Sequence, residues 1–514
     1  MKTSDELKKW VDTLTVSEKR FVKLLGKARA GSSSQLLDLF DLLNKNDANV
    51  SVSAQKLLGQ SLPTVSIRLK DLILDGLRIL HKEDNTDALL RTTLDEIAIL
   101  HEKKLYRAAA RQLKRIRRLA LETCRYGFAH QCIEWELKTI ATGNPGEARA
   151  LLKELREEEL AVLKKLDDLR NLRSRHDILV TLIRQYSLHR DPKVLEEVCA
   201  QAEHECVHRL CQSGGYVEQA YAVNILGIRD LYERKPMEAI VRYKKLLREW
   251  QNHPEWQRDQ TELLLQVCRY YQFACFYSPV DWNEARGYMT MLSGFKGLSP
   301  HARCDFDRML YHNQFTLALN SGKLDSVKTL IPEIESWLVR EADHLSESQV
   351  LPFLYNFAVA QFLISDYQSA NRIVVRILNT PNRNVRTDIR ECALVLQAVL
   401  QYELENDQLS EYLTRAGKRR FTKTNSEIKF ELAVISHLDV LVRKDSPGEI
   451  AASLDQLIDE LEQLAVQSKD GIPLLGLNEI RIWAESKKTG LPLRGIFLDA
   501  VRKNLEALGQ SFVL

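Results

Sequence analysis

The segment HECVH holds the residues of this sequence whose types and spacing most directly suggest chemistry. It runs from His204 to His208, with a glutamate directly after the first histidine. On a helix, residues i and i+4 share one face, so two imidazoles could hold one Zn²⁺ while the glutamate activates a water bound to the metal. The motif therefore raises the hypothesis of metal-assisted hydrolysis.

The neighbouring residues argue against a zinc metallopeptidase. In the extended form of the motif Gly would stand at Cys211 and His at Gly214, and neither does. Helical spacing predicts that one continuous helix here buries an apolar stripe, made by Leu195, Cys199, Ala202, Cys206 and Leu210. His204 and His208 then lie on the solvent side. With Cys211 they form an i, i+4, i+7 set that could bind a metal, but we expect a polar outer face and no cofactor.

The composition favours helices as the elements that carry these residues. The 514 residues include only 13 Pro and 21 Gly, whereas Leu, Ala, Glu, Lys and Arg dominate. The net charge is +3, so global charge predicts no particular partner. No apolar run reaches the ~18 residues that span a bilayer. The nine cysteines are scattered and form no CxxC pair, so we expect a cytoplasmic protein with reduced thiols.

Helical segments separated by short Gly/Pro breaks follow one another from about residue 83 to the end, and they contain a degenerate repeat. The segment LPFLYNFAVAQFLISDYQSANRIVVRILNTP resembles a tetratricopeptide repeat. Asn356, Phe357 and Ala358 stand where that family favours Asn, Leu and Gly; Asp366 and Tyr367 mark the turn, Ala370 is the small residue of the second helix, and Pro381 closes the unit. Small residues at such places let the two helices of a hairpin approach closely.

Further copies extend the resemblance along the chain. They centre on Ala109, Ala239, Ala285 and Val327; in the second of them Leu226 and Gly227 are the pair on the first helix and Tyr243 is the aromatic residue of the second helix. The last four centres, Ala370 included, are 46, 42 and 43 residues apart, which is longer than the family's unit of about 34. The segments LTVSEKRFVKLL, ILHEKKLYRAAARQLKRIRRLA and LNEIRIWAESKKTGLPL together are similar to uncharacterised bacterial tetratricopeptide-like proteins, notably from Bacteroidetes.

The resemblance implies an all-α fold: a right-handed α-solenoid of stacked antiparallel helical hairpins. We expect a small N-terminal helical unit over residues 1–82, in which Thr15 and Glu18 form a capping box, and a repeat array over 83–514 with C-terminal capping helices from about 471.

The N-terminal unit has two interpretations. Residues 52–80 resemble the helix-turn-helix of bacterial transcription regulators, with Thr64, Ser66 and Arg68 facing the major groove and Lys70 a phosphate. Asp71 and Asp75 reduce the net positive charge that binding to DNA phosphates needs. The alternative is a helical cap that shields the first repeat from water.

Two basic stretches and one long charged helix remain. The first stretch carries Arg111, Lys114, Arg115, Arg117, Arg118 and Arg125, and the second Arg415, Lys418, Arg419, Arg420 and Lys423. Either could bind RNA or an acidic partner, or serve only as a solvated helix face. The long helix, with Leu152, Leu155, Val162, Leu166 and Leu169 on one side, is consistent with a coiled coil or with a helix packed in the array.

The predicted function is a non-enzymatic scaffold that binds a peptide or protein partner on the concave face of the repeats. By the resemblance, the first helix of each hairpin lines that face. Its predicted contact residues are Asn224, Tyr271, Asn313 and Asn356. An asparagine can donate to and accept from a peptide backbone at once, although these side chains could instead bond neighbouring helices. A DNA-binding regulator and, more remotely, a zinc metallopeptidase are the alternatives.

Overall fold

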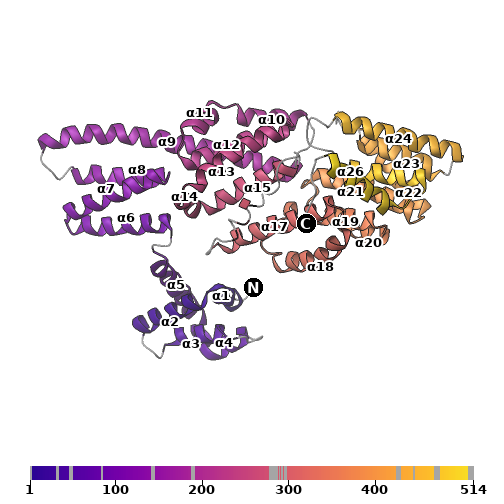
Figure 1. Cartoon of the computed structure of the whole chain (residues 1–514). Helices are drawn as coiled ribbons and strands as arrows, with labels where there is room; N and C mark the ends of the chain where they lie inside the picture. The colour runs from indigo at the N-terminus through magenta and orange to yellow at the C-terminus, as the bar shows by residue number, and fades with distance from the viewer. Residues whose placement is uncertain are drawn as a thin grey trace. The chain divides into compact units, whose positions relative to one another are not determined.

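A computed structural model of the chain confirms the all-α prediction. It describes residues 3–30, 34–45, 50–82, 85–140, 145–186, 192–276, 287–288, 290, 293, 298–423, 430–443, 446–467 and 475–507. Over these ranges the chain forms helices and no strand (Figure 1). None of the described helices is long and apolar enough to cross a membrane. The predicted repeat centre Ala285 lies outside the described residues.

The chain divides into two compact units, Met1–Leu166 and Asp167–Leu514. The division falls inside the 42-residue helix α9 (Pro145–Tyr186) and not at residue 82. The N-terminal helices nevertheless have a core of their own, and each unit is described by itself below.

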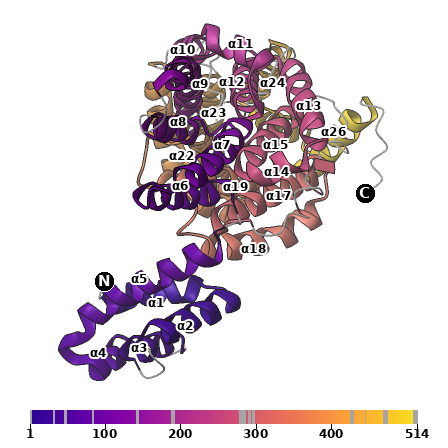
Figure 2. The same ribbon diagram turned by 90° about the vertical axis from the view of Figure 1, so that its left-hand side faces the viewer.

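The first five helices of unit 1 form a bundle around one apolar core (Figure 2). They are α1 (Thr3–Thr13), α2 (Val16–Ala30), α3 (Gln35–Leu43), α4 (Val50–Leu58) and α5 (Leu62–Leu80), with a short 3₁₀ turn at Gly59–Ser61. Phe40 and Leu69 are fully buried at the centre. The predicted capping box is confirmed at the start of α2, since the backbone N–H of Thr15 donates to the Glu18 carboxylate (2.6 Å) and that of Glu18 donates to the Thr15 hydroxyl (3.3 Å).

Three further helices complete unit 1 together with the first part of α9. They are α6 (Thr86–Glu102), α7 (Tyr106–Glu122) and α8 (Tyr126–Ile140), and α7 packs against both of the others. The buried stripe of α7 consists of Ala109, Leu113, Ile116 and Ala120, which leaves the opposite face of the helix to solvent.

Unit 2 is built from helices that pack in consecutive pairs (Figure 1). After the C-terminal part of α9 come α10 (Pro192–Ala202), α11 (Glu205–Ser213), α12 (Tyr216–Tyr232), α13 (Pro236–Gln251), α14 (Pro254–Asp259), α15 (Thr261–Phe276), α17 (Pro300–Asn320), α18 (Leu324–Arg340), α19 (Glu347–Leu363), α20 (Tyr367–Leu378), α21 (Thr387–Glu403), α22 (Asp407–Phe421), α23 (Phe430–Val442), α24 (Pro447–Gln467), α25 (Leu477–Thr489) and α26 (Leu493–Ala507). The helices α12, α15, α17, α19 and α21 also contact one another in that order; we call these five the inner row.

The same turn joins the two helices of six hairpins. Its central residue adopts the left-handed conformation, with φ between 54° and 71°, at Lys104, Cys124, Arg234, Gly322, Ser365 and Glu405. The next backbone N–H then donates to the carbonyl five residues earlier, at 2.7–3.0 Å, and so satisfies one of the free carbonyls at the helix end. Only one of the six residues is glycine, so the turn is hard to recognise from its sequence.

A buried small or medium-sized residue follows each of these turns at a fixed distance. Five residues after the left-handed position come Ala109, Ala129, Ala239, Val327, Ala370 and Ser410, all at most 1% exposed. Four of the predicted repeat centres are among them. The regularity of the repeat therefore lies in the distance from turn to helix contact, because the total length of each hairpin varies.

Gly227 on α12 contacts Tyr243 on α13, and this contact requires a glycine. A Cβ atom at Gly227 would lie 2.4 Å from the Tyr243 hydroxyl and 2.5 Å from its ring carbon Cζ. Tyr243 is fully buried and has no room to move away. The close approach of α12 and α13 thus depends on the missing side chain.

We predict that Gly227→Ala destabilises unit 2 by roughly 1–3 kcal/mol, the cost of overpacking a filled core. Urea denaturation followed by circular dichroism measures the loss. Gly127→Ala in α8 is the control, because no atom lies within 4 Å of a Cβ built there. A Gly227→Ala variant as stable as the wild type would show that this packing is unimportant.

Candidate functional site

The HECVH segment does not lie on one helix, so the predicted metal set is not assembled. Helix α10 ends at Ala202 and α11 begins at Glu205. Between them His204 caps α11 in an extended conformation, with its Nδ1 accepting from the backbone N–H of Cys206 at 3.3 Å. His204 and His208 are exposed as predicted, but the break removes the i, i+4 relation on which shared metal binding depends.

The predicted buried stripe is correct at Ala202, Cys206 and Leu210, whereas Leu195 and Cys199 are only half-buried. Val194 and Val198 take the buried places of α10 instead. Burial raises the pKa of the Cys211 thiol, which disfavours the thiolate that binds metals. Across the ranges that the structure describes, no group of three His, Cys, Asp or Glu side chains is placed to hold a metal ion. The metallopeptidase alternative has no assembled site.

The predicted DNA-reading face of α5 is wrong at Ser66, one of its four residues. Thr64 and Arg68 are exposed, but Ser66 is fully buried and cannot reach a base. Lys70 is half-buried, pairs with Glu6 at 2.8 Å and lies over the Trp10 ring. Ser66 is buried because α5 packs against three helices, α1, α2 and α3, so that more than one face of α5 lies against the core.

The four predicted contact residues lie on successive helices of the inner row, but only two reach the surface. Asn224 on α12 and Tyr271 on α15 are fully buried. Asn313 on α17 is half-buried. Its Nδ2 donates a hydrogen bond to the side-chain oxygen Oε1 of Gln272 on α15 at 2.8 Å, so it bonds a neighbouring helix. Asn356 on α19 is half-buried, and its amide has no hydrogen-bond partner among the described residues.

The C-terminal part of α9 covers the inner row at α12 and α15. Its buried residues are Leu169, Leu172, His176, Leu179 and Leu182. The imidazole of His176 meets the edges of Tyr221 on α12, with ring centroids 5.3 Å apart, and of Tyr270 on α15, at 6.4 Å. At the end of α9, the Arg184 carbonyl accepts from the backbone N–H of Arg386 at 3.3 Å. The seven-residue spacing of Leu169 and His176 was a signal in the sequence for this buried seam.

A charged cluster lies on α15, α17 and α19 of the inner row. Arg308 donates to Asp305 at 3.1 and 3.2 Å, Arg269 lies 3.9 Å from the same carboxylate, and Gln349 also donates to it at 3.1 Å. Burial raises the pKa of Asp305, but Arg308 and Arg269 outweigh that effect and hold it below its ordinary value. Two guanidinium groups thus share one carboxylate, which leaves a local positive charge. Sequence spacing gave no indication of this cluster, because its members come from separate helices.

Two histidines near this cluster are held neutral. Burial lowers the pKa of His176 to about 4, a shift that Asp177 opposes and Arg269 reinforces. Burial, with the positive charges of Arg308 and Arg386, also lowers the pKa of His312 to about 4. Arg386 is itself neutralised by a bidentate pair with Asp388, at 2.6 and 2.8 Å.

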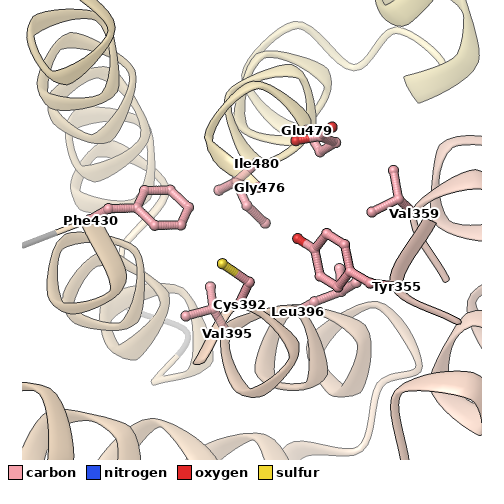
Figure 3. A pocket seen from close by; sticks show the side chains of 9 residues that line it. All are labelled: Tyr355, Val359, Cys392, Val395, Leu396, Phe430, Gly476, Glu479 and Ile480. Atoms are coloured by element: carbon pink, nitrogen blue, oxygen red, sulfur yellow. The ribbon is translucent and has the colours of Figure 1, made fainter. Parts of the chain in front are cut away.

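A small pocket opens between α19, α21, α23 and α25 (Figure 3). Its lining consists of Tyr355, Val359, Cys392, Val395, Leu396, Phe430, Gly476, Glu479 and Ile480. The cavity volume that the centre of a water-sized sphere can reach is about 10 Å³, so the pocket can hold about one water molecule. The Cys392 thiol donates to the Leu475 carbonyl at 3.3 Å, and burial raises its pKa well above the ordinary value. This chemistry is that of an inert, packed thiol rather than of a nucleophile.

No protein-family model matches the chain, and a comparison with curated proteins finds no significant match. The function proposed below therefore rests on the geometry of unit 2.

We predict that unit 2 loses stability as the pH falls from 7.5 to 5.0. Unfolded His176 takes up a proton below about pH 6.5, whereas the folded side chain stays neutral down to about pH 4. The unfolded state thus binds more protons in this window, and His176 alone contributes a loss of roughly 2 kcal/mol. Urea titrations at both pH values should show a correspondingly smaller loss for His176→Leu. An unchanged pH dependence would mean that His176 is already solvated in the folded protein.

We also predict that Asn224→Leu stabilises the protein. Both polar atoms of the Asn224 amide are buried without a hydrogen-bond partner in the described structure. A leucine of similar size removes that desolvation cost, a gain of about 1 kcal/mol. The melting temperature tests this, with Asn356→Leu on the exposed side of the inner row as the neutral comparison. A fall in melting temperature for Asn224→Leu would reveal a buried partner, such as a water molecule.

Proposed function

We propose that this protein is a non-enzymatic scaffold that binds an extended segment of a peptide or protein partner along the inner row of unit 2. In this proposal the stacked helix pairs continue as a right-handed, tetratricopeptide-like superhelix, and the inner row forms its concave face. The supporting observation is that three polar side chains on α15, α17 and α19, those of Arg269, Arg308 and Asn356, stay partly accessible.

The free amide of Asn356 suits an extended backbone. It can donate through Nδ2 and accept through Oδ1 at once, and neither atom is hydrogen-bonded to another described side chain. Asn313, in contrast, already uses a donor on Gln272. The proposal therefore assigns backbone gripping to Asn356 and a supporting role to Asn313. Asn224 and Tyr271 have no contact with the partner, because both are buried.

The charge of the inner row favours an acidic partner segment. Arg269 and Arg308 share Asp305, and their side chains are 30% and 14% exposed. A carboxylate from a partner would supply the missing negative charge in a partly desolvated site, where charge-assisted hydrogen bonds are strongest. A basic segment would meet two guanidinium groups and be repelled.

The test starts from peptides selected on the purified full-length protein from a random-sequence library. We expect acidic peptides, and we expect Asn356→Ala to weaken their binding about fivefold, the loss of roughly 1 kcal/mol in hydrogen bonding. Fluorescence anisotropy measures the dissociation constants. Asn379→Ala, an exposed asparagine at the end of α20, is the matched control and should bind like the wild type.

Two results would contradict the proposal. One is a set of selected peptides that bind Asn356→Ala as tightly as the wild type, which would remove the inner row from partner binding. The other is a preference for basic peptides, which would show that the Arg269–Asp305–Arg308 cluster is only structural.

A further inference from the structure

Helix α7 in unit 1 and the turn before it carry a strip of cations, most of which have no ion pair with a described acidic side chain. The strip consists of Lys103 and Lys104, which precede the helix, and of Arg107, Arg111, Lys114, Arg115 and Arg118 on it, all of them exposed. Spacings of three and four residues from Arg107 to Arg118 place the five cations of the helix on one face, opposite the buried stripe of Ala109, Leu113 and Ile116. No acidic residue occurs between Lys103 and Leu121. Of the seven, only Arg118 pairs with a described acid, Glu122, at 3.6 Å.

Two other arginines of the same sequence stretch have structural roles and do not belong to the strip. Arg117 points into unit 1 and pairs with Glu136 at 3.1 Å and Glu158 at 2.6 Å. Arg125, after the end of α7, pairs with Asp87 at 2.9 Å. The helix thus separates its cations by role: Arg117, which faces the core, is paired, and those that face solvent, apart from Arg118, are left unpaired.

The second basic stretch shows what a solvated helix face looks like in this protein. On α22, Arg415 pairs with Glu411, Lys418 with Asp439 at 2.5 Å and Arg420 with Glu391 at 3.7 Å. There the local acids balance most of the charge. The strip on α7 lacks that balance, so its like charges repel one another in the free protein and favour a polyanion.

The composition of the strip distinguishes between polyanionic partners. A protein interface has apolar or aromatic anchors at its centre, whereas the exposed apolar residues among these cations are only Leu105, at one end of the strip, and Ala110. A membrane surface would need an exposed apolar face for insertion, but the apolar face of α7 is buried in unit 1. Single-stranded nucleic acid is bound by stacking aromatic rings, and Tyr106, the one aromatic residue of α7, packs edge-on against His101.

We propose that the strip on α7 binds double-stranded nucleic acid through its phosphate backbone, without reading the bases. From Arg107 to Arg118 the helix extends roughly 17 Å at 1.5 Å per residue. Long flexible cations at each turn can therefore follow several successive phosphates of a duplex, releasing counterions as they bind. This activity is independent of the inner row, which belongs to unit 2.

The test uses the purified full-length protein and a labelled random-sequence DNA duplex of about two helical turns. Anisotropy titrations at roughly 50 to 200 mM salt should show binding that weakens steeply as salt rises. The plot of log K against log salt has a negative slope. In the triple variant Arg107→Ala, Arg111→Ala, Arg115→Ala this slope should become less steep by about 2.7, or 0.9 for each lost phosphate contact. The dissociation constant at the lowest salt should rise about tenfold or more.

A matched variant controls for total charge. Arg415→Ala, Arg419→Ala, Lys423→Ala removes the same number of charges from the exposed side of the second basic stretch, and we expect its duplex affinity to stay within about twofold of the wild type. The substituted side chains of the α7 variant are exposed and unpaired, so circular dichroism and melting temperature should not change.

An RNA duplex of the same length bound with a similar salt slope would support recognition of the backbone. The proposal is overturned if the wild type does not bind either duplex at the lowest salt, if both triple variants lose affinity equally, or if a single strand binds more tightly than the duplex. Binding to phosphatidylserine vesicles that depends on the α7 arginines, with no duplex binding, would overturn it in favour of a membrane surface.

Discussion

The close approach of paired helices at a small or medium-sized residue, set five positions after a left-handed turn, is the contact on which the rest of the structure depends. The turn returns the chain sharply and closes the helix end with a backbone hydrogen bond, so that the next helix starts in a fixed direction. Residues such as Ala239 and Ala370 then allow backbones to approach, and Tyr243 or Phe357 fills the space beside them. Because each pair buries its apolar surface against the next helix, stability is shared along the row.

This packing also determines which polar groups are left for binding. Inner-row helices contact two kinds of neighbour, the second helix of a pair and the next inner helix, and α12 and α15 are additionally covered by α9. A polar residue on the covered part of α12, such as Asn224, is therefore buried even though its side chain is polar. Arg269, Arg308 and Asn356, on α15, α17 and α19, keep part of their surface. In unit 1 the same principle acts on α7, where Arg117 is drawn into ion pairs while Arg111 stays unpaired.

Much of the secondary structure and repeat could be predicted from local signals. The capping box at Thr15, the contact of Gly227 with Tyr243 and the repeat centres at Ala109, Ala239, Val327 and Ala370 follow from short-range patterns that packing preserves. The prediction of one helix across HECVH failed, because apolar periodicity continues through the break at His204 even though the backbone does not. Ser66 failed as a DNA contact for a different reason: helical phase alone does not reveal how many neighbours surround a helix.

The sequence by itself determined that the chain is all-helical, where many of its helices begin and end, and that small residues recur at helix contacts, since these depend on interactions within a few residues. Only the tertiary structure decided that Asn224 and Tyr271 are buried and that Arg269 and Arg308 share Asp305. It also decided that the cations of α7 divide between the core and solvent. Burial and charge pairing depend on residues brought together from helices far apart in the chain, and no pattern along one segment specifies those neighbours.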